Sequence, residues 1–321
     1  MLTYIYLNVN SYFVHTIPEN DNKGNDSMER RTDLAVEERE LLGEDIKGVE
    51  YSDEESGGLR IERLRITTER AGQLLKKPVG TYVTAQLPPL TDNIRDTDSR
   101  VRALSDEIRR LLPVNGLVLV AGLGNTEITP DALGPKTASK VLATRHITGE
   151  IARSTGLDRL RAVAVLNTGV TGQTGIETGE LLLGVIRNIR PSAMIVIDAL
   201  ASRRLERLGC TVQISDTGIS PGAGVGNRRV RIDSKTMGIP VIAIGVPTVV
   251  DALTLAFDLL DINDEKQGME LSERITPEGR SMVVTPKEVD LLVNRASGMI
   301  SLSVNMALQS DIDTEDLLNL L

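Results

Sequence analysis

The stretch that decides the fold is residues 181–198, which read LLLGVIRNIRPSAMIVID. In its first half, residues 181–189, apolar residues recur at the spacing of an amphipathic helix. The second half is a continuous apolar run over residues 194–197 that leads directly into Asp198. A strand that is apolar on both faces is typical of a parallel sheet covered by helices on both sides. The stretch therefore predicts one helix and one buried strand of an α/β fold.

Similar short apolar runs occur on both sides of this stretch, at residues 117–120, 162–166, 211–214 and 241–244. Helical patterns separate several of them, as expected for strands joined by crossover helices. We therefore expect a mostly parallel twisted sheet with helices on both faces. A small N-terminal β subregion should add strands near residues 64–67 and 80–84, and a helix should follow from about Asp98. A long C-terminal helix should begin near Pro286, where the sequence TPKE offers a capping residue and a proline for the first turn.

The composition excludes several classes of function. The net charge of −9 argues against broad binding to nucleic-acid backbones, which needs clustered Lys and Arg. No run approaches the ~20 apolar residues of a membrane span, and the first basic residue, Lys23, comes too late for a signal peptide. Cys210 is the only cysteine, which fits a reducing compartment. We expect a cytoplasmic protein with no membrane or nucleic-acid partner.

The N-terminal region differs in character from the rest of the chain. Residues 1–33 are predicted to be a flexible leader, followed by a single α/β domain over residues 34–321. Residues 20–26 and 53–58 are polar and acidic, and we expect both to be flexible. Met28 is a candidate internal start site.

Polar or glycine-rich segments follow each expected strand. They begin at residues 122, 167, 198, 215 and 246. In open parallel sheets, ligands bind beyond the carboxyl ends of the strands. We therefore expect the functional site on this rim.

Several familiar catalytic motifs fail at single residues. Glu127 stands where a dinucleotide-binding loop needs its third glycine, and no phosphate-binding loop ends in Gly-Lys-Ser or Gly-Lys-Thr. Residues 218–222 read GISPG, but Pro221 has no N–H to stabilise an oxyanion. The two histidines, His15 and His146, cannot build a histidine-based zinc site with one cysteine.

Two aspartates on the expected rim remain as candidates. Asp198 ends a buried strand, and Asp131 follows a glycine-rich loop and a Thr-Pro turn. Each has a structural alternative as a helix cap: Asp131 for a helix near Lys136, and Asp198 for a helix over residues 203–208. We expect Asp251 to stabilise a helix N-terminus instead.

Five blocks of sequence resemble the spore germination protease family. They are residues 122–135 with GLGN and TPDALGP, 167–177 with NTGVTGQTGIE, 197–203 with IDALASR, 215–227 with SDTG and PGAGVGN, and 245–252 with GVPTVVDA. The likeness runs from about Met28 to the C-terminus. It implies an endopeptidase that degrades small acid-soluble spore proteins at germination, forms a homotetramer and matures from a zymogen.

The resemblance also implies the site. The two catalytic aspartates of the family correspond to Asp131 and Asp198, which implies an aspartic-type hydrolase with no cofactor. Two carboxylates brought close share a proton, so that one can act as base towards water and the other as acid. The fold implied is phosphorylase- or hydrolase-like and is similar to that of hydrogenase-maturation endopeptidases, which hold a metal with carboxylates and a histidine. A carboxylate-bound metallo-endopeptidase of that kind therefore stays open as the alternative.

One further motif lies in the leader. Residues 32–37 read TDLAVE, which resembles the family's cleavage pattern of an acidic residue, an apolar residue, Ala or Ser, any residue and Glu. The resemblance predicts propeptide cleavage between Asp33 and Leu34. Four arginines are weaker candidates for pairing with an acidic substrate side chain: Arg203, Arg204, Arg228 and Arg229. A phosphorylase-type nucleoside enzyme and a non-catalytic binding module are more distant alternatives.

Overall fold

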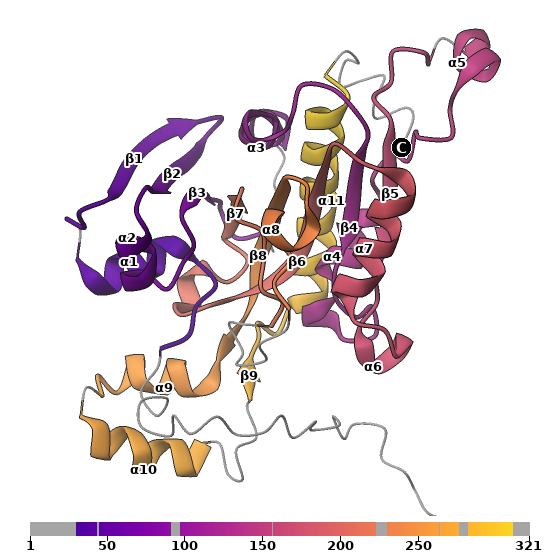
Figure 1. The fold of residues 1–321 in the computed structure, drawn as a ribbon. Helices are drawn as coiled ribbons and strands as arrows, with labels where there is room; N and C mark the ends of the chain where they lie inside the picture. The colour runs from indigo at the N-terminus through magenta and orange to yellow at the C-terminus, as the bar shows by residue number, and fades with distance from the viewer. Residues whose placement is uncertain are drawn as a thin grey trace, which may run out of the picture.

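The structure is a computed structural model that describes residues 30–43, 45–90, 97–155, 157–222, 230–262, 264–275 and 282–310. Within these residues a nine-stranded sheet has the order β1-β2-β3-β7-β8-β6-β4-β5, and β9 pairs with β8 (Figure 1). The strands are β1 Val49–Ser56, β2 Leu59–Ile66, β3 Gly80–Gln86, β4 Val118–Gly122, β5 Val163–Asn167, β6 Ala193–Ser202, β7 Thr211–Ser215, β8 Val241–Asp251 and β9 Val283–Val284. The expected α/β fold is confirmed.

Helices cover both faces of this sheet. They are α1 Ala35–Leu42, α2 Glu69–Leu74, α3 Thr97–Leu111, α4 Leu133–Ala138, α5 Gly149–Thr155, α6 Thr171–Thr174, α7 Thr178–Ile189, α8 Ser234–Met237, α9 Ala252–Leu259, α10 Glu265–Ile275 and α11 Val289–Leu308, with 3₁₀ turns η1 Thr129–Asp131 and η2 Leu205–Arg207. One face packs against α3, α4 and α11, and the other against α7 and α8. Among the described residues no helix is long and apolar enough to cross a membrane.

The buried side chains of β6 divide between the two faces. Ile195 and Ile197 belong to the core under α3 and α11, whereas Met194 and Val196 belong to the core under α7 and α8. Because side chains alternate along a strand, Asp198 continues the row of Met194 and Val196.

The sheet is parallel in its centre and antiparallel elsewhere. Strands β5, β4, β6 and β8 are parallel neighbours, and the remaining pairs are antiparallel. Strand β7, expected in the parallel series, runs opposite to β8. The reason is the short connection over residues 203–210, because a parallel return needs a crossover of about a dozen residues or more. The loop after β7 therefore begins at the opposite end of the sheet from the other expected loops.

The N-terminal subregion is more ordered than its acidic sequence indicates. The expectation that residues 53–58 are flexible is wrong, because they form the end of β1 and its turn into β2. Asp53 pairs with Arg60 at 2.5 Å and Glu54 with Arg63 at 2.7 Å, so the charged side chains that suggested flexibility hold an exposed edge hairpin. At the other end of the chain, α11 begins at Val289, slightly later than expected.

Candidate active site at the carboxyl ends of β4 and β6

Asp198 lies within β6, not at its end. The side chain is buried, with the residue 6% exposed, and its Oδ1 accepts a hydrogen bond from the N–H of Ala199 at 2.9 Å. Strand β4 ends at Gly122, opposite Ile197, so Asp198 lies just past the end of that neighbour. Because β6 continues to Ser202, Asp198 is not the cap of a following helix.

Asp131 ends the turn η1, which follows β4. Its Oδ2 accepts a hydrogen bond from the N–H of Asn125 at 2.7 Å, which closes the loop back on itself. Gly124 has φ +112°, and a Cβ there would overlap the carbonyl oxygen of Asp131, so the loop requires glycine at this position. The N-cap residue of α4 is Ala132, which leaves Asp131 without the capping role considered as its alternative.

The loop that carries Asp131 is seated on β6 and β8. Turn η1 contacts both strands, and the hydroxyl of Thr248 in β8 donates to the carbonyl oxygen of Pro130 at 2.8 Å. The N–H of Leu123 donates to the carbonyl oxygen of Ile197 at 2.8 Å, next to Asp198. The structure therefore brings the elements that carry Asp131 and Asp198 together at the carboxyl-terminal side of the parallel strands.

Asn125 links this loop to the loop after β5. Its Oδ1 accepts from the N–H of Glu127 at 3.0 Å and from Nε2 of Gln173 at 2.7 Å. Two loops of the expected rim are thereby fixed against each other. Asp251 takes the structural role expected of it, because its Oδ1 accepts from the N–H of Thr254 at 2.8 Å and caps α9.

The segment with the expected cleavage bond is held against the sheet. The N–H of Asp33 donates to the carbonyl oxygen of Ala201 at 2.9 Å, and the N–H of Ala201 donates to Oδ2 of Asp33 at 2.8 Å. The side-chain amide of Gln213 donates to the carbonyl oxygen of Asp33 at 3.0 Å and accepts from the N–H of Ala35 at 2.8 Å. Leu34 and Ala35 are fully buried. Residues 31–33 of the expected flexible leader are thus fixed in place, as the N–H of Arg31 also donates to Thr254 at 3.0 Å.

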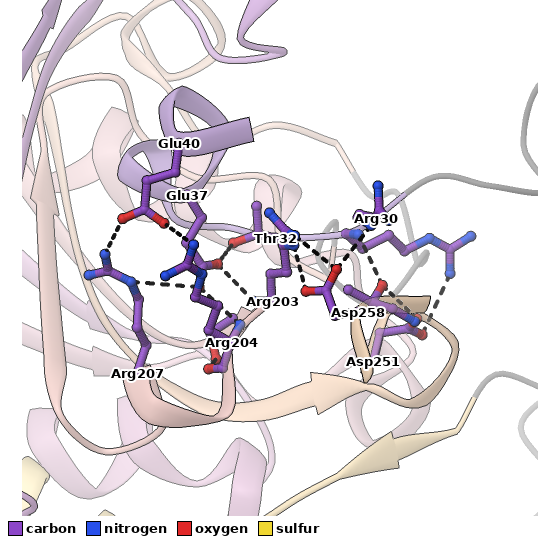
Figure 2. A network of polar contacts seen from close by, with 12 residues as sticks. Arg30, Thr32, Glu37, Glu40, Arg203, Arg204, Arg207, Asp251 and Asp258 are labelled. Atoms are coloured by element: carbon purple, nitrogen blue, oxygen red, sulfur yellow. Dashed lines mark hydrogen bonds and ion pairs between the residues drawn. The ribbon is translucent and has the colours of Figure 1, made fainter. Parts of the chain in front are cut away.

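Glu37 of the same segment is a fully buried carboxylate (Figure 2). It accepts hydrogen bonds from the N–H groups of Arg203 at 2.7 Å and Arg204 at 3.0 Å, and from the hydroxyl of Thr32. Nε of Arg207 lies 3.7 Å from its Oε1. Burial raises the pKa of Glu37 above its ordinary value, although all of these neighbours favour the ionised form.

The guanidinium groups expected to bind substrate have partners within the chain. Arg203 forms a bidentate pair with Asp258 at 2.6 and 2.9 Å, and Arg30 also contacts Asp258 at 2.9 Å (Figure 2). Arg204 lies 3.2 Å from Glu206. Arg228 and Arg229 lie outside the described residues.

Residues that could hold a metal are scarce in this region. The part of the chain that the structure describes contains no group of three or more His, Cys, Asp or Glu side chains suited to a metal ion. His146 lies exposed in a turn before α5.

The profile of the germination protease family matches residues 27–274. The chain belongs to the germination protease family. It is 44% identical to the germination protease of Caldanaerobacter subterraneus subsp. tengcongensis, with 91% of this chain and 98% of the relative covered. The germination proteases of Clostridium tetani and Priestia megaterium are 40% and 34% identical, over 90% and 89% of this chain and 98% and 95% of those relatives.

Family membership confirms the resemblance found in the sequence and makes the chain a protease of spore germination, so its substrates are proteins. A solved [NiFe] hydrogenase maturation protease, HycI of Thermococcus kodakarensis, aligns with 62% of this chain and 98% of its own length, at a TM-score of 0.35 and 15% identity.

Proposed function

We propose that this germination protease is an aspartic endopeptidase that cleaves small acid-soluble spore proteins, with Asp131 and Asp198 acting on one water molecule. The observation that carries the proposal is the seating of the Asp131 loop on β6 beside Asp198. Each carboxylate accepts a backbone N–H, from Asn125 and from Ala199, and these contacts orient both groups before substrate binds.

The reaction needs one proton shared by the two carboxyl groups. The ionised aspartate takes a proton from water while the water oxygen attacks the peptide carbonyl carbon, and the protonated aspartate donates to the carbonyl oxygen. Collapse of the tetrahedral intermediate then breaks the C–N bond. The aspartate that took the proton from water gives it to the leaving nitrogen, and a hydroxyl group of the intermediate returns its proton to the other aspartate. Hydrolysis by this route consumes one water and needs no cofactor.

The same active site serves for maturation. We infer that the protein is made as a zymogen and cuts itself between Asp33 and Leu34, because residues 32–37 carry the family's acidic, apolar, Ala, any residue, Glu pattern. The protein works as a homotetramer in the cytoplasm of the forespore and spore core. The net charge of −9 disfavours retention of the protease on the spore DNA.

The test is to replace each aspartate by asparagine in the full chain. Asp131→Asn and Asp198→Asn should each abolish cleavage of a peptide with the TDLAVE sequence and leave the intact mass of the chain unchanged over time. Asp106→Asn, on an exposed face of α3, is the matched control and should keep full activity. Circular dichroism checks that the variants fold.

Full activity in either active-site variant would refute the aspartate pair. Loss of wild-type activity on incubation with a chelator would instead support the carboxylate-bound metallo-endopeptidase of the hydrogenase-maturation type.

A further inference from the structure

Four residues of the cleavage pattern each occupy a distinct place on the sheet. Asp33 pairs with Ala201 of β6 through two hydrogen bonds of 2.9 and 2.8 Å, one from its backbone and one to its carboxylate. Leu34, Ala35 and Glu37 are fully buried. A leader segment that only lay on the surface would not bury these side chains. We therefore compare residues 33–37 to a peptide bound in a groove, and call the surface that they contact the groove.

The apolar position of the pattern packs in a small apolar cluster over β6. Leu34 packs with Val36, Leu200 and Ile219. The Leu200 side chain lies over Gly245 of β8, where a Cβ would come within 2.5 Å of Leu200 Cγ. Glycine at 245 therefore leaves the room in which Leu200 and the bound leucine pack.

The small position of the pattern is set by a second apolar cluster. Ala35 packs among Leu64, Ile66, Leu75 and Tyr82 of the N-terminal subregion. It is also the first residue of α1, so the bound segment is extended as far as Leu34 and helical from Ala35. A larger side chain at this place would overpack the cluster.

The glutamate position is recognised by donors that the fold holds in place (Figure 2). The N–H groups of Arg203 and Arg204 follow β6 directly and both point at the Glu37 carboxylate. Arg207 is buried, and its Nε, which has no hydrogen-bond acceptor among the described residues, lies 3.7 Å from Glu37. The two N–H groups bond to different oxygens of Glu37, so an amide in this place would turn its NH2 group towards one of the donors and lose that hydrogen bond.

Gln213 links the groove to the candidate active site around Asp198. Its amide binds the carbonyl oxygen of Asp33, which belongs to the bond expected to be cut. Gln213, Gly245 and Asp198 are direct neighbours across β7, β8 and β6, so their side-chain positions share one face. The backbones of Asp198 and Gln213 are therefore two strand spacings of about 4.8 Å apart. A cavity of about 110 Å³ beside Asp33, lined also by Gln213 and Gly245, is large enough to hold water.

We propose that this groove is the substrate-binding site of the protease, and that residues 33–37 occupy it as a competitor built into the chain. Its ligand is a protein segment with an acidic residue, an apolar residue, a small residue and, two positions later, a glutamate. The proposal rests on the proposed function and adds Gln213, Arg207 and the N–H groups of Arg203 and Arg204 as specificity determinants.

Cutting the Asp33–Leu34 bond does not empty the groove. Leu34, Ala35 and Glu37 remain part of the chain through α1. A ligand tethered in this way competes as if it were present at a concentration on the order of millimolar. Substrate must therefore displace them. As a result, replacing the glutamate by glutamine should have opposite effects in the enzyme and in the substrate: Glu37→Gln weakens the competitor, whereas the same change in a peptide weakens the ligand.

The test measures binding, not cleavage. A fluorescein-labelled peptide with the sequence of residues 30–41, RRTDLAVEEREL, is titrated with the full chain carrying Asp198→Asn, which prevents turnover. Adding Glu37→Gln to the chain should tighten the peptide Kd about tenfold, and changing the peptide glutamate that corresponds to Glu37 into glutamine should weaken it about tenfold. Glu270→Gln removes an Arg274-paired carboxylate of α10, outside the groove, and is the matched control that should leave Kd unchanged.

A thermal melt checks that the Glu37→Gln chain is folded, and Leu34→Ala gives a second way to weaken the competitor. Equal binding of the two peptides, or a peptide Kd that neither chain variant tightens, would overturn the groove assignment. A cleavage assay with Asp198 intact separates this result from the proposed function. If the peptides bind as expected but are not cleaved, the endopeptidase mechanism is refuted and the groove assignment is supported. If both peptides are cleaved equally well, the groove assignment is refuted and the endopeptidase mechanism is supported.

Discussion

Replacing Gln213 by leucine should release the segment around Asp33 while the sheet stays folded. The Gln213 amide makes two hydrogen bonds to this segment, a partly buried one at 3.0 Å to the Asp33 carbonyl oxygen and a buried one at 2.8 Å from the Ala35 N–H. Leucine has a similar volume and can make neither bond. Each buried backbone group that loses its partner costs about 1–3 kcal/mol. The free energy needed to lift the segment should therefore fall by roughly 2 kcal/mol or more, which corresponds to amide exchange about 30-fold faster.

Hydrogen exchange followed by mass spectrometry measures this change directly. Peptides that cover residues 30–42 should exchange faster in the variant, whereas peptides from β4 and from residues 193–200 of β6 should keep their protection. Gln309→Leu is the matched control. The Gln309 amide is also buried and makes the same two kinds of bond, at 2.9 Å from the N–H and at 3.1 Å to the carbonyl oxygen of Arg161, outside the groove.

Two results would refute this reasoning. Unchanged exchange in residues 30–42 would mean that the Gln213 amide does not hold the segment. Faster exchange throughout β4, β6 and β8 would mean that Gln213 supports the whole sheet and has no specific role in clamping residues 33–35.

Three further predictions concern the active-site loop, the buried carboxylate and an internal ion pair. Gly124→Ala should slow peptide cleavage and cost about 1–3 kcal/mol of stability, because its Cβ would overlap Asp131; unchanged kcat/KM would contradict the need for glycine there. The raised pKa of Glu37 means that its protonated form favours the folded state, so its contribution is present below pH 4.5 and is lost as the pH rises through the raised pKa. Glu37→Gln loses one of the two backbone hydrogen bonds at every pH but does not titrate. Its deficit in melting temperature relative to the parent should therefore shrink as the pH is raised from 4.5 to 7, and a constant deficit would show that burial does not shift the Glu37 pKa. Arg203→Gln should lower the free energy of unfolding in urea by about 1–3 kcal/mol, because among the described residues it leaves Asp258 paired with Arg30 alone. An equal loss in the Arg203→Gln, Asp258→Asn double variant would confirm that the two residues act as a pair, and additive losses would contradict it.

The core of the fold could be predicted because its signal is local. Apolar runs such as residues 194–197 and 241–244 are buried on both faces, and burial of that kind leaves a continuous hydrophobic pattern. The edge strand β1 left no such pattern, because it is exposed along its length and is held by charged pairs. Acidic composition alone does not distinguish a charged hairpin from a flexible segment.

The two rim aspartates could be found from sequence because each follows a recognisable strand or turn. The groove could not. Gln213 is a polar residue within a buried strand, and Glu37 is one of several glutamates on a short helix. Their roles depend on contacts between residues more than 160 positions apart, which no local pattern records.

The direction of β7 links these observations. If β7 ran parallel to β8, as the strand series predicts, its residues would meet β8 in a different register and the connection from β6 would have to cross a face of the sheet. Because the connection is instead the short turn η2, β7 returns antiparallel and places Gln213 opposite Gly245, which is opposite Asp198. The connection over residues 203–210 also presents the N–H groups of Arg203 and Arg204, and the Arg207 side chain, to Glu37. One short connection therefore positions both the clamp on the scissile carbonyl and the donors for the glutamate. It follows that lengthening this connection should impair recognition of the glutamate and of the carbonyl together.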